Sequence, residues 1–218
     1  LAPLSRKLLE AEGVQNTLLI VGVAITISWI LCGIFFQAPD KSLVNAGGAA
    51  AKSGTSEMRQ YTSGEMMRTI NFYLLLATMF FGLISYFMVS PVSQTYQIDL
   101  GIPSAVAVSA VMLGSIVNAG ARLVLPTLAD KVGRIVCIKG VLIVAVIAMG
   151  VLAVSRSLAV TVAVVLMYGC YGGIMGSFPS LTSSIFGMKH TGENYGFVMF
   201  GIVFATFGAP AISGLVSS

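Results

Sequence analysis

Charge is what this sequence has least of. The 218 residues include eight Asp and Glu and twelve Lys and Arg, so 9% are charged, whereas 56% are hydrophobic. A soluble globular domain carries about 25% charged residues. So few charges cannot cover a globular surface, which excludes an ordinary soluble enzyme, a disordered protein and a nucleic-acid binder. The net charge of +4 comes from a few basic residues that lie mostly between apolar runs, and not from a phosphate-binding patch.

Histidine and cysteine are scarce as well. His190 is the only histidine, and the three cysteines, Cys32, Cys137 and Cys170, all fall inside apolar runs. One histidine excludes a haem held by two histidines and any multi-histidine metal centre. The odd cysteine count shows no metal-ligand spacing. We therefore expect no metal, no cofactor and no disulfide, and we expect His190 to be a solvated loop residue.

Long apolar runs are what the chain has in abundance. Six of them are long enough to cross about 30 Å of hydrocarbon as helices. They lie at 17–36, 70–90, 104–125, 135–154, 159–178 (extending towards 186) and 194–216. Because no run alternates apolar and polar residues, we predict helices and not strands. The first run is too long for a signal peptide, so it is expected to be a mature span.

A polar segment divides these runs. Residues 37–69 contain a stretch rich in Gly, Ala and Ser at 45–54, a composition that stays flexible and builds no core. We therefore predict three parts, namely 1–36 with one span, a linker at 37–69 that is irregular near 40–64, and a five-helix bundle at 70–218. The fold class is all-α, a polytopic membrane bundle of about six transmembrane helices.

The basic residues predict which ends face the cytoplasm. The side that holds 37–69, 126–134 and 187–193 carries seven of them: Lys41, Lys52, Arg59, Arg68, Lys131, Arg134 and Lys189. The opposite side carries three: Arg6, Lys7 and Arg156. Cytoplasmic loops carry the excess of Lys and Arg. The linker is therefore expected in the cytoplasm of a multi-pass membrane protein, with Lys52 and Lys189 inside and Arg156 outside.

Residues 126–134 read Pro-Thr-Leu-Ala-Asp-Lys-Val-Gly-Arg and lie between two runs. We interpret them as a loop in which Asp130 accepts hydrogen bonds and Gly133 permits a tight turn. Lys131 and Arg134 would anchor this loop at the cytoplasmic surface. The less specific alternative is an ordinary basic turn.

This segment resembles the loop signature of the major facilitator superfamily, Gly-x-Leu-Ala-Asp-Arg-x-Gly-Arg. Pro126 stands where the family has Gly, a change that bears on close helix packing there. Residues 168–196 resemble the oxalate/formate antiporter group and the monocarboxylate transporters, with a Gly-rich helix containing Pro179, then Phe186-Gly187, then Asn194-Tyr195-Gly196.

The resemblance implies an incomplete twelve-helix carrier. Residues 1–218 would span helices six to eleven, with 37–69 as the central loop, and most of the N-terminal half would be missing. The implied function is secondary active transport of small organic anions, a monocarboxylate or similar, by alternating access, as symporter or antiporter. Protons are a candidate coupling ion. The bilayer, the substrate anion and the missing half would be the partners.

Arg122 is the leading candidate site residue because a charged side chain inside a span is costly. The resemblance implies that it anchors a carboxylate, with Asn118 one turn earlier on the same face as a polar contact. The alternative is that Arg122 snorkels to the interface or clamps the 126–134 segment. Tyr168 and Tyr171, and also Tyr73 and Tyr86, would either line a polar cavity or simply pack.

Two further observations limit the function. The run 194–216 contains no Lys or Arg, which favours a monoanion unless another part of the carrier supplies a second cation. Asp99 is either a proton site or a solvated loop or N-cap residue. The alternative function is a facilitator-type transporter of an unrelated substrate such as a drug or a sugar. We predict no enzyme, because an intramembrane serine protease needs a histidine inside the membrane and His190 lies in a loop.

Overall fold

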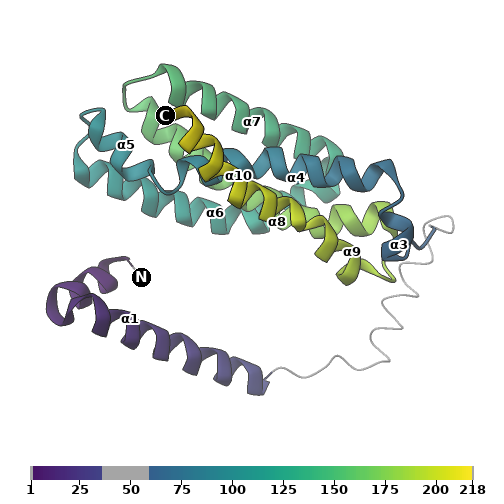
Figure 1. Cartoon of the computed structure of the whole chain (residues 1–218), viewed down its shortest axis with the longest axis horizontal. Coiled ribbons are helices and arrows are strands. Elements are labelled where there is room, and N and C mark those ends of the chain that lie inside the picture. The colour runs from purple at the N-terminus through teal and green to yellow at the C-terminus, as the bar shows by residue number, and fades with distance from the viewer. Residues whose placement is uncertain (1, 36–58, 218) are drawn as a thin grey trace. The chain divides into compact units, whose positions relative to one another are not determined.

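The computed structural model describes residues 2–35 and 59–217, and every regular element within them is a helix (Figure 1). The prediction of an all-α membrane bundle is confirmed. The chain divides into two compact units, Leu1–Met58 and Arg59–Ser218, and each is described by itself. The predictions for 40–58, including the linker's irregular part and Lys52, lie outside the described residues.

The described part of the first unit is one long helix, α1 (Ala2–Phe35), which is broken at Gly13 with φ 74° and ψ 173°. Glycine adopts this conformation without the penalty that a Cβ brings. Beyond the break the helix presents exposed apolar side chains such as Leu18, Ile27 and Ile34. The predicted span at 17–36 is therefore helical throughout its described part, and the helix already begins at Ala2.

The second unit contains five stretches that are helical, long and apolar enough to cross a membrane, counted over the described residues. These are α4 (Ile70–Val89), α6 (Ser104–Val132), α7 (Arg134–Val154), α8 (Ala159–Phe186) and the pair α9 (Thr191–Val198) and α10 (Phe200–Ser217). Two short helices, α3 (Ser63–Met66) and α5 (Ser93–Asp99), flank α4. The apolar runs predicted from 70 onwards are thus confirmed as membrane-length helices.

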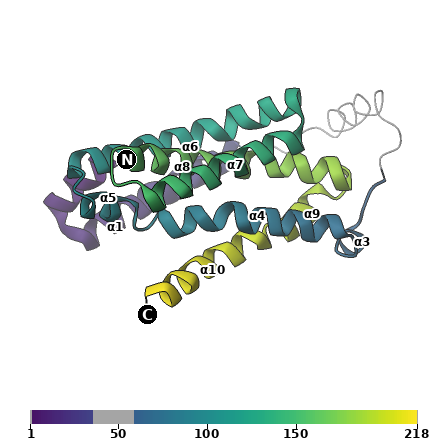
Figure 2. The ribbon, with the colours of Figure 1, turned by 90° about the horizontal axis from the view of Figure 1, so that it is seen from above.

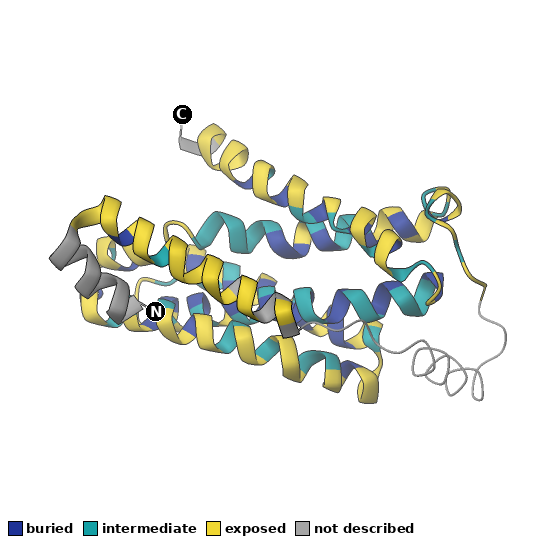
Figure 3. Ribbon diagram, turned by 90° about the horizontal axis from the view of Figure 1, so that it is seen from below, coloured by how far each residue is buried: buried dark blue, intermediate teal, exposed yellow. Residues whose placement is uncertain are grey.

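Helix α8 is the centre of this unit. Half of the residues in the most apolar stretch of α8 are buried, whereas only 11% of those in α6 are. Helix α8 is buried because it packs against α6, α7 and α4. Helix α10 in turn lies on α4 (Figure 2). Met167, Ile174 and Phe178 of α8 are fully buried. Exposed apolar residues cover much of the outer faces (Figure 3). Since lipid is as apolar as these side chains, tight packing holds the helices together more than the hydrophobic effect does.

The predicted loop at 126–134 is wrong. Helix α6 continues through Pro126 to Val132, and Gly133, with φ 106°, is the single residue between α6 and α7. A proline removes one helical hydrogen bond and clashes with the preceding turn, but the helix is not obliged to end there. The positive φ at Gly133 is what ends it, because a side chain would be strained in that conformation.

Three other boundaries differ from prediction. The last run begins at Thr191 and divides at Met199, where the Ile202 amide donates to the Met199 carbonyl three residues back in place of four. Asp99 is exposed and ends α5, so it is not an N-cap, and Pro103 holds that position for α6. The end of the linker is ordered, since α3 begins at Ser63 with a capping box that the composition did not suggest.

Candidate functional site

The site begins at the seam where α6 crosses α8. A Cβ on Gly172 would overlap the carbonyl oxygen of Asn118 and lie 2.9 Å from its carbonyl carbon. A Cβ on Gly176 would lie 2.7 Å from the Arg122 oxygen, 2.9 Å from its Cα and 3.1 Å from Pro126 Cγ. The backbones of the two predicted site residues are therefore pressed against α8. Close packing at Pro126 is retained because α8 supplies the glycine.

Arg122 is exposed, and its Cζ lies 5.6 Å from the ring centroid of Tyr171, within the range of a cation–π interaction. It makes no ion pair and no side-chain hydrogen bond with any residue in the described part of the chain. Asn118, one turn earlier, is half-buried, and its amide is likewise without a hydrogen bond to the described residues. Both polar groups are thus available to a ligand.

A cluster of tyrosines adjoins Arg122. Tyr171 stacks on Tyr86 with centroids 4.1 Å apart, and Tyr86 meets Tyr168 edge to face at 5.1 Å. The Tyr168 hydroxyl lies 3.3 Å from Ser90 Oγ, so that one of the two donates to the other. Tyr195 of α9 lies within electrostatic reach of Arg122. The structure thus brings together three of the four predicted tyrosines.

One tyrosine predicted for the site lies outside the tyrosine cluster, and two residues near the cluster were not predicted from the sequence. Tyr73 is exposed and packs edge to face on Phe72, away from this cluster. Ser90 and Tyr195 were not singled out for the site. Tyr195 stands in the Asn-Tyr-Gly stretch, which is a sequence signal, but its proximity to Arg122 depends on how α9 returns across α8.

The residues of the 126–134 segment form a clamp between three helices. Arg134 donates to Asp130 Oδ1 through Nη2 at 3.2 Å and through Nε at 3.4 Å, and its Nη1 donates to the Ser180 carbonyl of α8 at 3.0 Å. Gly133 permits the turn that brings Arg134 back over Asp130. Lys131 is exposed beside them. The clamp's third partner, Ser180, carries no sequence signal because it contributes only a backbone carbonyl.

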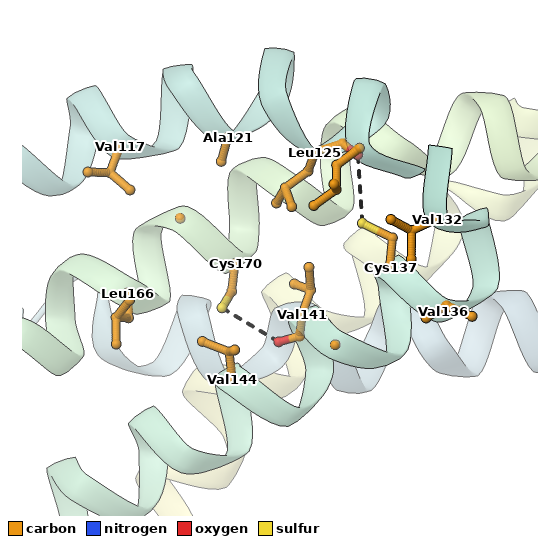
Figure 4. A pocket seen from close by; sticks show the side chains of 13 residues that line it. Val117, Ala121, Leu125, Val132, Val136, Cys137, Val141, Val144, Leu166 and Cys170 are labelled. Carbon is orange, nitrogen blue, oxygen red and sulfur yellow. Dashed lines mark hydrogen bonds between the residues drawn. The ribbon is translucent and has the colours of Figure 1, made fainter. Parts of the chain in front are cut away.

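A separate groove of about 470 Å³ lies between α6, α7 and α8. Figure 4 shows that apolar side chains such as Leu125, Val141 and Leu166 line it. The Cys137 and Cys170 thiols donate to the backbone oxygens of Leu125 and Val141 at 3.6 Å, and both cysteines are free. None of the residues lining this groove is charged, so it offers no counter-charge to an anion.

Six of the eight basic residues described in the second unit gather at one end of the bundle, where α6 gives way to α7 and α8 to α9 (Figure 1). They are Arg59, Arg68, Lys131, Arg134, Lys139 and Lys189. Arg156 lies at the opposite end, between α7 and α8. The predicted charge asymmetry is therefore an asymmetry of the folded bundle.

His190 is half-buried at the start of α9, 3.8 Å from Glu193 Oε2, a contact that becomes an ion pair when the imidazole is protonated.

Comparison with known proteins agrees with this architecture. The family model of the Major Facilitator Superfamily matches residues 1–210. An uncharacterized MFS-type transporter, YhjX of Escherichia coli strain K12, is 30% identical over 200 residues, which is 89% of this chain and 48% of that protein. The oxalate:formate antiporter of Oxalobacter formigenes is 26% identical over 198 residues, which is 89% of this chain and 46% of the antiporter.

The chain thus spans about half the length of the curated relatives it matches. The match to the family model extends over nearly all of the sequence, including both units and the Asp130–Arg134 clamp. Together with the five membrane-length helices of the second unit, it shows that this protein is an integral, multi-pass membrane protein that belongs to the major facilitator superfamily of transporters.

Proposed function

We propose that the chain is part of a secondary transporter that moves small organic anions by alternating access, with Arg122 as the carboxylate anchor. The observation that carries the proposal is a guanidinium on a membrane helix with no acidic partner among the described residues. A charged side chain on a membrane-spanning helix is energetically costly, so its presence there marks a candidate functional residue. Guanidinium is planar, matches a carboxylate with two parallel donors and stays charged at any cellular pH.

The surroundings of Arg122 favour a small ligand. The Tyr171 ring covers one approach to the guanidinium, and Asn118 offers an amide that can donate to a second oxygen. The seam with α8 fixes the backbone of both residues, which orients their side chains before the substrate arrives. Binding of the anion would neutralise the guanidinium and lower the cost of closing the cavity around it.

The substrate is proposed to be a monoanion, because α9 and α10 contain no Lys or Arg. One relative is named an oxalate:formate antiporter, so formate, lactate and oxalate are the informative probes. A dianion such as oxalate would need a second cation from another part of the carrier. Antiport and proton-coupled symport are both compatible with a single fixed cation.

The basic end of the bundle is proposed to face the cytoplasm, with the 37–69 linker on that side. Single cysteines at Lys189 and Arg156 test this in intact cells, in a carrier from which the native cysteines have been removed. An impermeant maleimide should label the cysteine at 156 and not the one at 189. The opposite pattern would reverse the orientation.

Counterflow in reconstituted vesicles tests the substrate class. Vesicles that contain the carrier, completed by the proposed N-terminal half, would be loaded with one unlabelled compound. The same compound in labelled form, namely formate, lactate, oxalate or glucose, would then be added outside. We expect exchange of at least one monocarboxylate, with Arg122→Ala reducing it by at least about 30-fold per folded carrier, the lower bound for truncating a buried charge pair. Lys139→Gln, which removes a cation on α7, is the matched control.

Glucose exchange with no acid exchange would favour the alternative, a facilitator-type transporter of an unrelated substrate. If Arg122→Ala exchanges a carboxylate at the parental rate and affinity, Arg122 is not the anchor, and its role would be to clamp or snorkel at the α6–α7 junction.

A further inference from the structure

The end of the linker is built into the bundle. Asn194 of α9 is fully buried, and residues of the linker satisfy its amide. Its Nδ2 donates to the Tyr61 carbonyl at 3.0 Å, and its Oδ1 accepts from the Ser63 hydroxyl at 3.2 Å. The same hydroxyl lies 3.3 Å from Glu193 Oε2. A buried amide that loses its partners is strongly unfavourable, so Asn194 depends on the linker staying in place.

A second attachment joins the linker to the end of α8. The Tyr61 amide donates to the Phe186 carbonyl at 2.9 Å, and the two rings meet edge to face at 5.7 Å. Gln60 Oε1 accepts from the Lys189 amide at 2.9 Å. Gly187 has φ 88°, and its missing side chain leaves the space that the Gln60 amide occupies. The connection between α8 and α9 is therefore folded around the linker.

The docked segment also has internal structure that shapes it for this contact. Thr62 and Glu65 form a capping box, in which the Thr62 amide and hydroxyl both donate to Glu65 Oε2 at 2.9 Å. Arg59 lies over the Tyr61 ring at 5.0 Å. Met66, at the end of α3, is fully buried. A segment organised in this way presents the Tyr61 carbonyl and the Ser63 hydroxyl to Asn194 at little further entropic cost.

The next residue along the chain connects this attachment to the substrate site. Tyr195 is half-buried and lies within electrostatic reach of both Arg122 and Tyr171. Asn194 fixes the rotation and depth of the first turns of α9, and Tyr195 is carried on the same turns. Displacement of Asn194 would therefore displace Tyr195 and alter its electrostatic interaction with the guanidinium.

We propose that Asn194 is a positioning residue, through which the end of the central linker holds the first turns of α9, the turns that carry Tyr195. The proposal rests on the carboxylate site proposed above. It makes the linker part of the substrate site's support rather than a passive tether between two halves. Asn194 itself does not touch the substrate.

Two substitutions test the contact from its two sides. Asn194→Asp keeps the shape and the acceptor for Ser63, but it turns a carboxylate oxygen towards the Tyr61 carbonyl, where both groups accept and neither donates. Ser63→Ala removes the linker's hydroxyl. Ser184→Ala is the matched control, because the Ser184 hydroxyl donates within α8 to the Leu181 carbonyl at 2.7 Å and does not contact the linker.

The measurements are KM and Vmax per folded carrier in the full-length protein, with labelled formate or lactate, whichever exchanges faster. Asn194→Asp and Ser63→Ala should raise KM about fivefold, the effect of one net hydrogen bond, with Vmax changed less than about twofold. Ser184→Ala should match the parent. In a Tyr195→Phe background, Asn194→Asp should raise KM by clearly less, because it acts through the hydroxyl that is already gone.

Tryptic cleavage after Arg59 and Arg68 in vesicles reports docking without any substrate. Both linker variants should be cleaved faster than the parent and the Ser184→Ala control, since cleavage requires the segment to open locally. Faster cleavage with an unchanged KM, or an undiminished effect in the Tyr195→Phe background, would overturn the positioning role. Unchanged cleavage and unchanged KM would overturn the docking as well. Loss of the carboxylate site would instead appear as parental exchange in Arg122→Ala.

Discussion

Helix α8 is held in two different ways along its length. In its middle, Gly172 and Gly176 let the α6 backbone approach until no side chain fits between the helices. At its end, the Ser180 carbonyl accepts from Arg134 and the Phe186 carbonyl accepts from the Tyr61 amide. The middle is therefore held by shape and the end by polar groups.

The difference follows from the solvent around each part. Within the bilayer the association of helices depends largely on how closely their surfaces fit, so small residues fix the geometry there. Near the membrane surface water competes for each hydrogen bond, so that each one contributes about 1 kcal/mol. Arg122 and Asn118 of α6 pack with their backbones against this middle part of α8. We therefore expect the middle to respond to added volume, and the end to respond to lost donors and to pH.

The largest effect is expected from a side chain added at the seam. Gly172→Ala places a methyl group on the Asn118 backbone and should lower the free energy of unfolding by about 1–3 kcal/mol, and Gly172→Val should leave no folded carrier. Gly140→Ala on α7 is the control, since an added Cβ there meets no described atom within 4 Å. That variant should be neutral or gain up to about 1 kcal/mol from helix propensity.

Thermal unfolding of the detergent-purified carrier measures both variants. Equal melting temperatures for Gly172→Ala and Gly140→Ala would show that the α6–α8 seam has room to spare. The contrast between the middle and the end of α8 would then fail.

A smaller effect is expected when the seam is left intact and the guanidinium is changed. Arg122→Lys keeps the charge and loses the two-pronged geometry, so KM for the carboxylate should rise about tenfold. Asn118→Ala should raise KM about threefold to fivefold. Neither variant should change the melting temperature, because Arg122 is exposed and Asn118 meets α8 through its backbone. A parental KM for Arg122→Lys would show that the site needs only a positive charge at this position and not the two parallel donors of a guanidinium.

The helices were predictable because membrane length and composition alone determine them. The predicted run 70–90 corresponds to Ile70–Val89, and 135–154 corresponds to Arg134–Val154. The extent of α6 was not predictable in the same way. A proline where an apolar run turns polar indicates the end of a helix. The structure instead ends α6 at Gly133, seven residues after Pro126, where the positive φ disfavours any residue with a side chain.

The site was predictable only in part, for a related reason. Arg122, Asn118 and the Asp130–Arg134 pair are conspicuous because charged and polar side chains are rare in apolar runs. Ser180 and Tyr61 contribute through backbone groups that every residue possesses. Asn194 is notable in the sequence, but its partners lie more than 130 positions away along the chain. Contacts of that kind depend on tertiary folding, and periodicity does not reveal them.

At the end of α8, the clamp should show moderate effects that separate its two contacts. Arg134→Ala loses a charged donor to the Ser180 carbonyl and should cost about 1–2 kcal/mol of stability. Asp130→Asn should cost less than about 1 kcal/mol, because Asp130 is 60% exposed in a solvent-screened ion pair. Lys131→Ala, the neighbouring control, should stay within about 0.5 kcal/mol. Thermal unfolding of the purified carrier measures all three, and an Asp130→Asn effect as large as that of Arg134→Ala would assign the clamp to the ion pair.

The smallest effect is expected from pH at the linker. Hydrogen bonds from the Thr62 amide and hydroxyl lower the pKa of Glu65, and the nearby Arg59 guanidinium acts in the same direction. A lowered folded-state pKa stabilises the segment above the ordinary glutamate pKa of about 4.3, and that contribution is lost as the pH falls through the folded-state value. Acid should therefore loosen α3, while the α6–α8 seam, which has no titrating contact in the described structure, should be unaffected.

Hydrogen exchange at the amides of 62–66, corrected for the intrinsic effect of pH on exchange, measures this loosening between pH 7 and about pH 3, so that the range includes values below the ordinary glutamate pKa. Glu65→Gln is the matched variant, because a glutamine completes a capping box and does not titrate. Its protection should be nearly independent of pH, whereas the parent should lose protection on acidification. If both lose protection equally, the acid response comes from another group, and the Glu65 carboxylate does not hold the linker segment in shape.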